Sequence, residues 1–258
     1  MDRGITVLVH GESGAGKSSF GVTAPYPRLL MDVESGYRFL PINYKVWDPF
    51  REAVPVADGS WDTIVVVVHD YNTMLHVYQI LRSGNHQFRS LIIDSISELQ
   101  DRLLTQLAGT DQVKMQQWGE VLRQMGGLLR DLRDLTTHPT NPLEAIVLTA
   151  MSKKDQEGVY RPYLQGQLAT QVPYLYDIVG ALVVESFPHP DPMQPNYNAR
   201  RMYIERTPKY EAKQRVRGRL GAVVEQDNLS VDKWLDTIFG PRVQPQPTSE
   251  STQTQPTQ

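Results

Sequence analysis

Residues 5–20 read ITVLVHGESGAGKSSF, and this stretch decides the fold class. In its first half, Ile5, Val7 and Val9 belong to an apolar run that is typical of a buried strand. In its second half, residues 11–18 fill the pattern G-x-x-x-x-G-K-[ST], in which a glycine-rich turn joins a strand to a helix. Backbone N–H groups of such a loop curl around the phosphates of a nucleotide. The stretch therefore predicts an α/β domain that binds a nucleotide.

Each position of this loop has a chemical reason. Glycine at positions 11, 14 and 16 lets the chain adopt backbone angles that are closed to other residues. Lys17 would supply a point charge to the outer phosphates, and Ser18 would offer a hydroxyl to a magnesium ion that bridges them. The following helix adds the positive end of its dipole. The expected cofactors are ATP and Mg²⁺, and the expected phosphate-binding residues are Gly11, Glu12, Ser13, Gly14, Ala15, Gly16, Lys17, Ser18 and Ser19.

Length and composition limit the number of domains and the kind of protein that the chain can form. It has 258 residues, no cysteine and a formal net charge of −3. This length suits one sizeable α/β domain, predicted to span residues 1–240. The lack of cysteine excludes disulfides and thiolate metal sites, and no long apolar span occurs, so a soluble, cytoplasmic protein without a membrane partner is expected. Residues 241–258 consist almost wholly of Pro, Gln, Thr and Ser and are predicted to form a disordered tail.

Phosphoryl transfer also needs carboxylates near the loop. An apolar run at residues 91–93 ends in Asp94, at the carboxyl end of a predicted central strand, where parallel sheets place their ligands. Asp94 is therefore the expected metal-side carboxylate, with Ser18 as the other metal ligand; alternatively, Asp94 caps the next helix. Another predicted strand ends in Asp32 and Glu34, which are expected to project on the same side of an extended chain. Glu34 would orient the attacking water, with Glu98 as the rival candidate.

The order of these motifs carries a family resemblance. The segments GESGAGKSS, LLMDVESG and LIIDSISEL look like the RecA-like branch of P-loop ATPases. More closely, the chain resembles phage-encoded nucleotide-binding proteins of the Sak type, RecA-like ATPases associated with single-strand annealing and recombination. Later blocks such as AIVLTAMSKK and RTPKYEAKQRVRGRLGA continue the resemblance, which covers roughly residues 4–240. By this resemblance, Asp94 matches the metal-side aspartate and Glu34 the catalytic glutamate, and the location is the host cytoplasm if a phage encodes the protein.

The expected fold is a three-layer α/β P-loop domain of the RecA-like type with a mostly parallel central sheet. Thr149 lies near the end of one strand, where the resemblance implies a polar residue that senses the γ-phosphate. An apolar stripe between residues 112 and 136 indicates a helix that packs in the core or contacts another subunit, although Gly126 and Gly127 weaken this prediction. Core strands are expected near 5–10, 28–34, 64–70, 90–95, 144–150 and 178–186, with late antiparallel strands near 200–207.

A loop after Thr149 combines positive charge with aromatic rings. Such a mixture can hold phosphates and stack unpaired bases, so the loop is expected to bind single-stranded DNA. The alternative is a solvated loop whose tyrosines pack on the domain. The candidate DNA-binding residues are Lys153, Lys154, Tyr160, Arg161 and Tyr163.

The densest positive region is residues 200–219, where eight Lys or Arg residues face only two Glu. Such clustering attracts polyanions. Arg206 and Lys209 are the candidates for side chains that reach the γ-phosphate of a neighbouring subunit, and Lys213 and Arg215 come next. The alternatives are a DNA path and a solvated basic hairpin.

Together these features predict a magnesium-dependent ATPase coupled to single-stranded DNA in phage recombination or replication. The expected partners are single-stranded DNA, further copies of the chain in a ring or filament, and a replication or single-strand-binding protein. Two alternatives remain open: a small-molecule or nucleotide kinase, and an ATP-dependent loader that acts on a protein partner. Fold alone does not choose among them.

Overall fold

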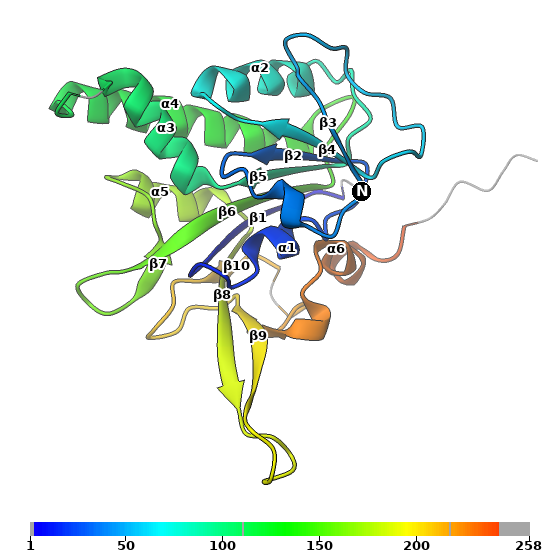
Figure 1. Ribbon diagram of the computed structural model, residues 1–258, viewed down its shortest axis with the longest axis vertical. Coiled ribbons are helices and arrows are strands. Elements are labelled where there is room, and N and C mark those ends of the chain that lie inside the picture. The colour runs from blue at the N-terminus through cyan, green and yellow to red at the C-terminus, as the bar shows by residue number, and fades with distance from the viewer. Residues whose placement is uncertain (1–2, 110, 217, 243–258) are drawn as a thin grey trace, which may run out of the picture.

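The computed structural model describes residues 3–109, 111–216 and 218–242. Within these residues, one sheet of eleven strands has helices on both faces (Figure 1). The strands are β1 (Ile5–Gly11), β2 (Arg28–Asp32), β3 (Tyr44–Val46), β4 (Thr63–Val67), β5 (Ser90–Asp94), β6 (Ala145–Lys154), β7 (Tyr160–Pro162), β8 (Ile178–Phe187), β9 (Tyr197–Tyr203), β10 (Lys213–Gln214) and β11 (Val223–Glu225). The helices are α1 (Lys17–Gly21), α2 (Tyr71–Arg82), α3 (Ile96–Ala108), α4 (Met115–Asp134), α5 (Leu168–Leu175) and α6 (Val231–Phe239), with short turns at Tyr37–Phe39, Leu135–Thr137 and Gln226–Asn228.

The sheet is mostly parallel, as the sequence predicts. Its main order is β11-β9-β8-β1-β6-β5-β2-β4-β3, and the strands from β8 to β3 run parallel. Three antiparallel pairings extend it on the far side of β1 (β9 and β10 each with β8, and β11 with β9), while β7 pairs antiparallel with β6. The carboxyl ends of β1, β6, β5 and β2 therefore lie side by side at one edge, where open parallel sheets bind ligands.

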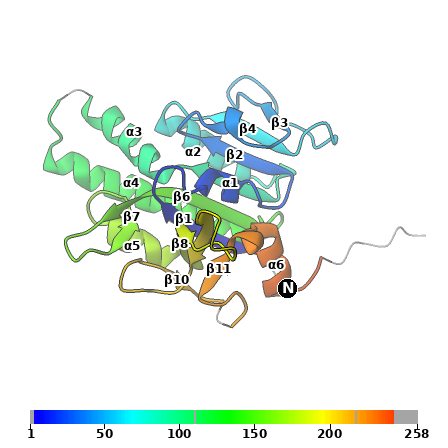
Figure 2. The same cartoon turned by 60° about the horizontal axis from the view of Figure 1, so that its bottom comes forward.

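Both faces of the sheet are buried, which explains why its central strands are continuous apolar runs. Alternate residues of β1 point to opposite faces: Leu8 packs with α2 to α5, whereas Val7 and Val9 pack with α1 and α6. On the second face the ring of Phe20 in α1 lies 5.1 Å from that of Trp234 in α6. Figure 2 shows α6 beside β11 on this side. The three-layer arrangement is thus confirmed.

The two glycines of α4 do not interrupt it. Gly126 and Gly127 each cost an exposed helix about 1 kcal/mol relative to alanine. The helix also buries Met125, Leu129 and Leu132 against the core, and each such side chain contributes roughly 1.5–3 kcal/mol. Burial outweighs propensity, so the apolar stripe packs in the core over this part of the helix. Met115, at the start of the helix, is 85% exposed and takes no part in it.

Several expected boundaries need correction. The strand expected at 28–34 ends at Asp32, and the one expected at 64–70 ends at Val67. The strand expected to end near Thr149 instead continues to Lys154, because it forms an antiparallel hairpin with β7. Of the predicted tail, residues 243–258 lie outside the described residues. None of the described helices is long and apolar enough to cross a membrane.

Candidate nucleotide-binding site

The loop between β1 and α1 has backbone geometry that only glycine adopts readily. Gly14 and Gly16 have φ angles of 78° and 101°, in the left-handed region. Gly11 is needed for a different reason, because a Cβ there would lie 2.4 Å from the backbone oxygen of Leu182 in β8. The pattern of glycines therefore reflects two requirements, a tight reversal of the chain and a close approach to the neighbouring strand.

Lys17 is the first residue of α1, and its side chain folds back over the loop. Its Nζ donates to the carbonyl oxygens of Gly11 and Glu12, each at 3.0 Å. Burial lowers the pKa of the Lys17 ammonium, while the carboxylates of Asp94 and Glu34 act in the opposite direction. The two acids thus lie near enough to influence the lysine, and all three side chains belong to one site.

Asp94 ends β5, two strands away from β1 in the sheet. Its side chain is buried and accepts a hydrogen bond from the hydroxyl of Thr149 on β6, the strand in between. The cap of α3 is Ser95, whose Oγ accepts from the backbone N–H of Glu98 at 3.3 Å. The interpretation of Asp94 as a helix cap is therefore wrong, and its carboxylate is held at the sheet edge by Thr149.

Glu34 lies beyond the end of β2, in a bend. The expectation that Asp32 and Glu34 project together from an extended chain is wrong, because the strand ends at Asp32 and residues 33–35 form a bend. Asp32 is buried and accepts from the N–H groups of Gly36 at 3.2 Å and Tyr37 at 3.4 Å, so it holds the turn. Burial raises the pKa of Asp32, an effect that these hydrogen bonds oppose.

The side chain of Glu34 is more exposed and is fixed by one contact. Its carboxylate accepts a hydrogen bond from the hydroxyl of Ser95, the residue next to Asp94. Ser95 was not among the expected site residues, although its position between a strand and a helix is a usual one for a capping serine. This contact brings the bend after β2 to the end of β5, and so places Glu34 close to Asp94.

Glu98 and Thr149 are the remaining candidates at this edge of the sheet. Glu98 lies in the first turn of α3, 3.4 Å from the Nε of Arg102, and lines a separate hollow with His69 and Asp70. Thr149 is fully buried behind Asp94, so its hydroxyl supports the carboxylate instead of facing the loop directly.

The residues present suit a nucleoside triphosphate with magnesium. The loop offers backbone N–H groups and the Lys17 ammonium to phosphate oxygens. A Cβ added at Gly14 would meet no atom within 4 Å, so the loop is open on that side. The hydroxyl of Ser18 and the carboxylate of Asp94 are hard oxygen ligands of the kind that magnesium prefers. These two side chains would hold the ion together with the phosphates.

Comparison with known proteins agrees with this site. The sequence model of a family described as an AAA domain matches residues 3–216. The chain belongs to this AAA-domain family. A search of the curated proteins finds no match. The matched segment contains the phosphate loop and both carboxylates, so the protein is a P-loop ATPase domain of the AAA type, with the nucleotide-binding role that this implies for the loop.

The predicted DNA-binding residues of the AAA domain lie on the hairpin of β6 and β7. Lys153 and Lys154 are exposed at the end of β6. The Nζ of Lys153 lies 4.9 Å from the ring centre of Tyr163, and that of Lys154 lies 5.9 Å from the ring centre of Tyr160. Each lysine therefore lies over a tyrosine ring, a pairing that the sequence order did not specify.

Arg161 on β7 differs from these lysines because acidic side chains surround it. Its guanidinium forms ion pairs with Asp155 and Glu211, each at 2.5 Å. These pairs raise the pKa of Arg161. The two carboxylates also offset its positive charge, which then attracts a phosphate less strongly. Within the hairpin of the AAA domain, Lys153 and Lys154 are therefore better placed than Arg161 to contact DNA.

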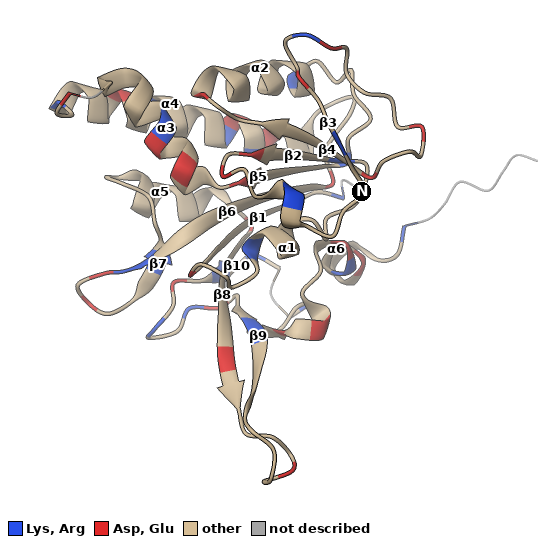
Figure 3. Ribbon diagram, in the orientation of Figure 1, with Lys and Arg blue, Asp and Glu red and all other residues tan. Residues whose placement is uncertain are grey.

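The late basic segment does not form a single surface. Figure 3 shows its Lys and Arg residues on β9 and around β10, interleaved with acidic residues. Arg206 is exposed and lines a hollow with Lys213. Lys213 itself is half-buried in β10, where burial lowers its pKa, and Arg215 pairs with Asp177 at 3.1 Å. Arg217, another basic residue of this segment, lies outside the described residues.

Two members of this segment approach the phosphate loop of the same chain. Lys209 lines a cavity together with Glu12 and Ser13. Arg200 on β9 donates from Nε to the carbonyl oxygen of Ala15 at 3.0 Å, and a Cβ at Gly16 would lie 2.8 Å from that nitrogen. The sequence singled out Arg200 only as part of a charged run, because its contact depends on how β9 pairs with β8.

Proposed function

We propose that this AAA domain is a magnesium-dependent ATPase that couples hydrolysis to single-stranded DNA, in phage recombination or replication. The observation that carries the proposal is the meeting of Lys17, Asp94 and Glu34 at one sheet edge. The order of the motifs, which resembles the Sak type of RecA-like ATPases, supports the narrower assignment.

The roles of the residues follow from their chemistry. The loop amides and Lys17 hold the phosphates, and Ser18 and Asp94 hold magnesium, which would neutralise charge on the phosphate oxygens. One carboxylate oxygen of Glu34 accepts a hydrogen bond from the Ser95 hydroxyl. The other oxygen is left to orient a water toward the terminal phosphate. Thr149 fixes the position of Asp94.

One β-strand, β6, links the nucleotide site to the proposed DNA-binding lysines and so supports the coupling. β6 carries Thr149, which contacts Asp94, and a few residues further on it carries Lys153 and Lys154. A shift of Asp94 on nucleotide binding can therefore reach the hairpin through one continuous strand. Polyanion binding by these lysines would be sensitive to salt.

Assembly is part of the proposal. Arg206 is exposed and would reach the nucleotide of a neighbouring copy in a ring or filament. A replication or single-strand-binding protein is the further partner that we propose, with the host cytoplasm as the location.

The test is steady-state ATP hydrolysis with and without single-stranded DNA, at low and at physiological salt. We expect DNA to stimulate turnover, with an effect that fades as salt rises. Lys17→Ala serves as the control and should abolish turnover while the fold remains intact. Turnover that DNA leaves unchanged, with no DNA binding, would overturn the coupling. Stimulation by a small acceptor instead would favour a kinase.

A further inference from the structure

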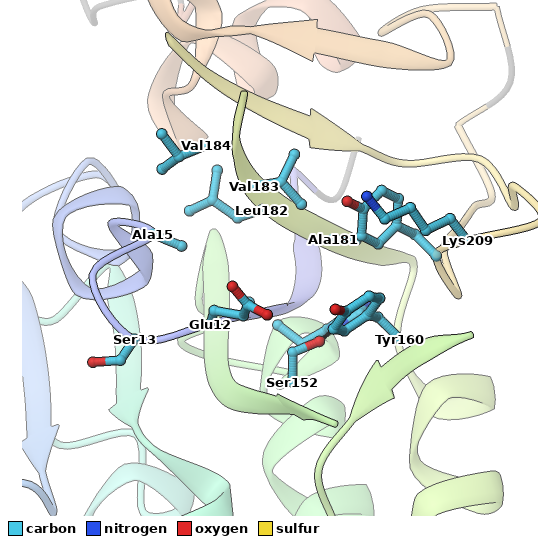
Figure 4. Close-up of a pocket in the computed structure, with 13 residues that line it drawn as sticks. Glu12, Ser13, Ala15, Ser152, Tyr160, Ala181, Leu182, Val183, Val184 and Lys209 are labelled. Carbon is cyan, nitrogen blue, oxygen red and sulfur yellow. Dashed lines mark hydrogen bonds between the residues drawn. The ribbon is translucent and has the colours of Figure 1, made fainter. Parts of the chain in front are cut away.

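A cavity of about 240 Å³ lies beside the phosphate loop, on the side of β8. Figure 4 shows its walls: Glu12 extends from the loop, Ser152 and Tyr160 come from the β6–β7 hairpin, Leu182 and Val183 from β8, and Lys209 from the late basic segment. Residues far apart in the sequence thus enclose one space directly next to the predicted phosphate site. The volume is below the roughly 300–1,000 Å³ of a pocket for a drug-sized ligand, so it suits one flat ring system.

One wall of the cavity is aromatic and carries positive charge. The rings of Tyr160 and Tyr210 lie 5.7 Å apart, and Tyr203 stacks on Tyr210 at 5.1 Å with an interplanar angle of 24°. Tyr203 does not line the cavity, so it backs Tyr210. The ammonium groups of Lys154 and Lys209 lie over Tyr160 and Tyr210, at 5.9 and 5.1 Å from the ring centres.

Backbone hydrogen bonds hold this wall in place. The N–H of Tyr160 donates to the carbonyl of Lys209 at 2.8 Å, and the N–H of Glu211 donates to the carbonyl of Tyr160 at 2.9 Å. The two tyrosines are therefore presented by paired segments instead of a free loop. A preformed aromatic surface loses little conformational entropy when it binds a flat ligand.

The cavity also offers hydrogen-bond acceptors close to these tyrosines (Figure 4). His10 is fully buried, with Nε2 2.8 Å from the carbonyl oxygen of Glu211 and Nδ1 2.9 Å from Oγ of Ser152. Because a carbonyl only accepts, Nε2 carries the proton of the neutral ring, and Nδ1 accepts from the Ser152 hydroxyl. The Ser152 oxygen keeps its lone pairs for a ligand, and the carboxylate of Glu12 adds further acceptors.

We propose that this space, the tyrosine pocket formed by Tyr160, Tyr210, Lys209, Ser152 and Glu12, binds a nucleobase. The base stacks on the tyrosines, its N–H groups meet the acceptors, and an attached phosphate meets Lys209. Two sources present this chemistry: an unpaired base of single-stranded DNA, and the adenine of ATP. The first source rests on the proposed DNA coupling, whereas the second needs only nucleotide binding.

The location gives the pocket a physical consequence. Glu12 and Ser13 belong both to the pocket wall and to the phosphate loop. A base bound here therefore contacts the loop itself, and its arrival changes the surroundings of the segment that holds the phosphates. Stimulation of turnover by DNA would have a direct structural route.

The experiment compares Tyr160→Ala and Tyr210→Ala with Tyr174→Ala as the matched control. Tyr174 is 74% exposed and also has a lysine, Lys213, over its ring at 5.7 Å, but it lies outside the pocket. Affinities for fluorescent oligothymidylate, ATP and inorganic tripolyphosphate are measured separately. Tyr210→Phe keeps the stacking surface and should bind like the wild type.

If the pocket takes a DNA base, the pocket variants lose roughly tenfold or more in oligothymidylate affinity and keep their ATP affinity. If it takes adenine, they lose ATP affinity but keep that for tripolyphosphate and for DNA. If the pocket variants lose no more affinity than Tyr174→Ala for any of the ligands, the proposed base-binding role of the pocket is overturned. In that case, DNA binding by the wild type would still leave the proposed function standing.

A second measurement does not depend on how well the variants fold. Wild-type protein is irradiated with oligonucleotides that carry 5-iododeoxyuridine and, separately, with 8-azido-ATP, and the attachment sites are mapped by mass spectrometry. Attachment to Tyr160 or Tyr210 with either probe supports the pocket and identifies its ligand. Attachment by both probes only at other residues would contradict it. Wild type that binds no DNA but attaches 8-azido-ATP at these tyrosines would separate the pocket from the DNA proposal.

Discussion

In the proposed mechanism, the hydrolytic step depends on Glu34. Its carboxylate is held by Ser95 beside Asp94, whereas its rival Glu98 is turned toward Arg102. We expect Glu34→Gln to bind ATP normally and to lower turnover by roughly a hundredfold or more, because an amide cannot act as a base toward water. Equilibrium nucleotide binding and steady-state hydrolysis measure the two effects. Glu98→Gln is the matched control, and a loss of turnover in that variant alone would reverse the assignment.

His10 connects acid stability to the strand that carries the phosphate loop. Burial lowers the pKa of His10 to about 4 from 6.5, against the hydrogen bond to the Glu211 carbonyl, and the nearby charge of Lys17 adds to the lowering. The unfolded chain binds a proton below its own pKa of about 6.5, whereas the folded protein does not until about pH 4. The contribution to stability is therefore complete above the unfolded pKa and is lost as pH falls through this window.

The measurement is urea unfolding at pH ~7.5 and ~5 for wild type and His10→Gln. Between these pH values, the free energy of unfolding of the wild type should fall by about 2 kcal/mol more than that of the variant, as the pKa difference of His10 implies. An equal loss in both proteins would show that other groups cause the acid sensitivity.

Sequence order was enough to find the residues that follow directly from a motif. Lys17, Ser18 and Asp94 are fixed by their distance along the chain from an apolar strand, so their place at the sheet edge could be predicted. Ser95 and Arg200 could not be found in this way, because their contacts with Glu34 and Ala15 join segments that only the completed fold brings together. The charge of Arg161 suggested DNA binding, but the β6–β7 hairpin brings Asp155 to it, and the fold brings Glu211 from a distant segment.

At the scale of elements, the pair β8 and β9 supports the phosphate loop. β8 contacts Gly11 through the Leu182 backbone, and β9 contacts Ala15 through Arg200. We expect Arg200→Ala to raise the KM for ATP several-fold, because the loop loses the charge-assisted hydrogen bond that holds the Ala15 carbonyl in place. Thermal unfolding should change little, since the Arg200 side chain is exposed.

Arg201 is the matched control for this prediction. It follows Arg200 on the same strand but points to Glu185 and Glu225, at 3.4 and 2.8 Å. Arg201→Ala should leave the KM for ATP unchanged and alter stability little, because its ion pairs are screened by solvent. Equal KM changes in both variants would mean that the strand acts through general charge and not through its contact with the loop.

The elements themselves differed in how well the sequence indicated them. Central strands such as β1 and β5 are buried on both faces, so their apolar runs identify them. β3, β7, β10 and β11 have two or three residues each and arise from pairing with a neighbour, which leaves no pattern of their own. The extension of β6 into a hairpin has the same cause, and it moves the predicted DNA-binding lysines from a loop to the end of a strand.

At the scale of the whole molecule, the two candidates for a trans-acting side chain lie at different places on the surface. Lys209 faces the phosphate loop of its own chain, whereas Arg206 is exposed at a hollow that contains no residue of that loop. An assembly of identical subunits would bring Arg206 of one copy to the nucleotide of the next. The prediction is that Arg206→Ala lowers turnover without weakening ATP binding, as loss of a trans-acting arginine does.

Mixing subunits tests whether this action crosses between copies. Lys17→Ala alone and Arg206→Ala alone should each be nearly inactive. In an equimolar mixture, about a quarter of the contacts would join an intact Lys17 site to an intact Arg206, so roughly a quarter of the wild-type turnover should return. Light scattering with ATP present checks that the mixture assembles. If it assembles and turnover stays at the level of the separate variants, Arg206 acts within its own chain, and the arginine of a neighbour has no part in hydrolysis.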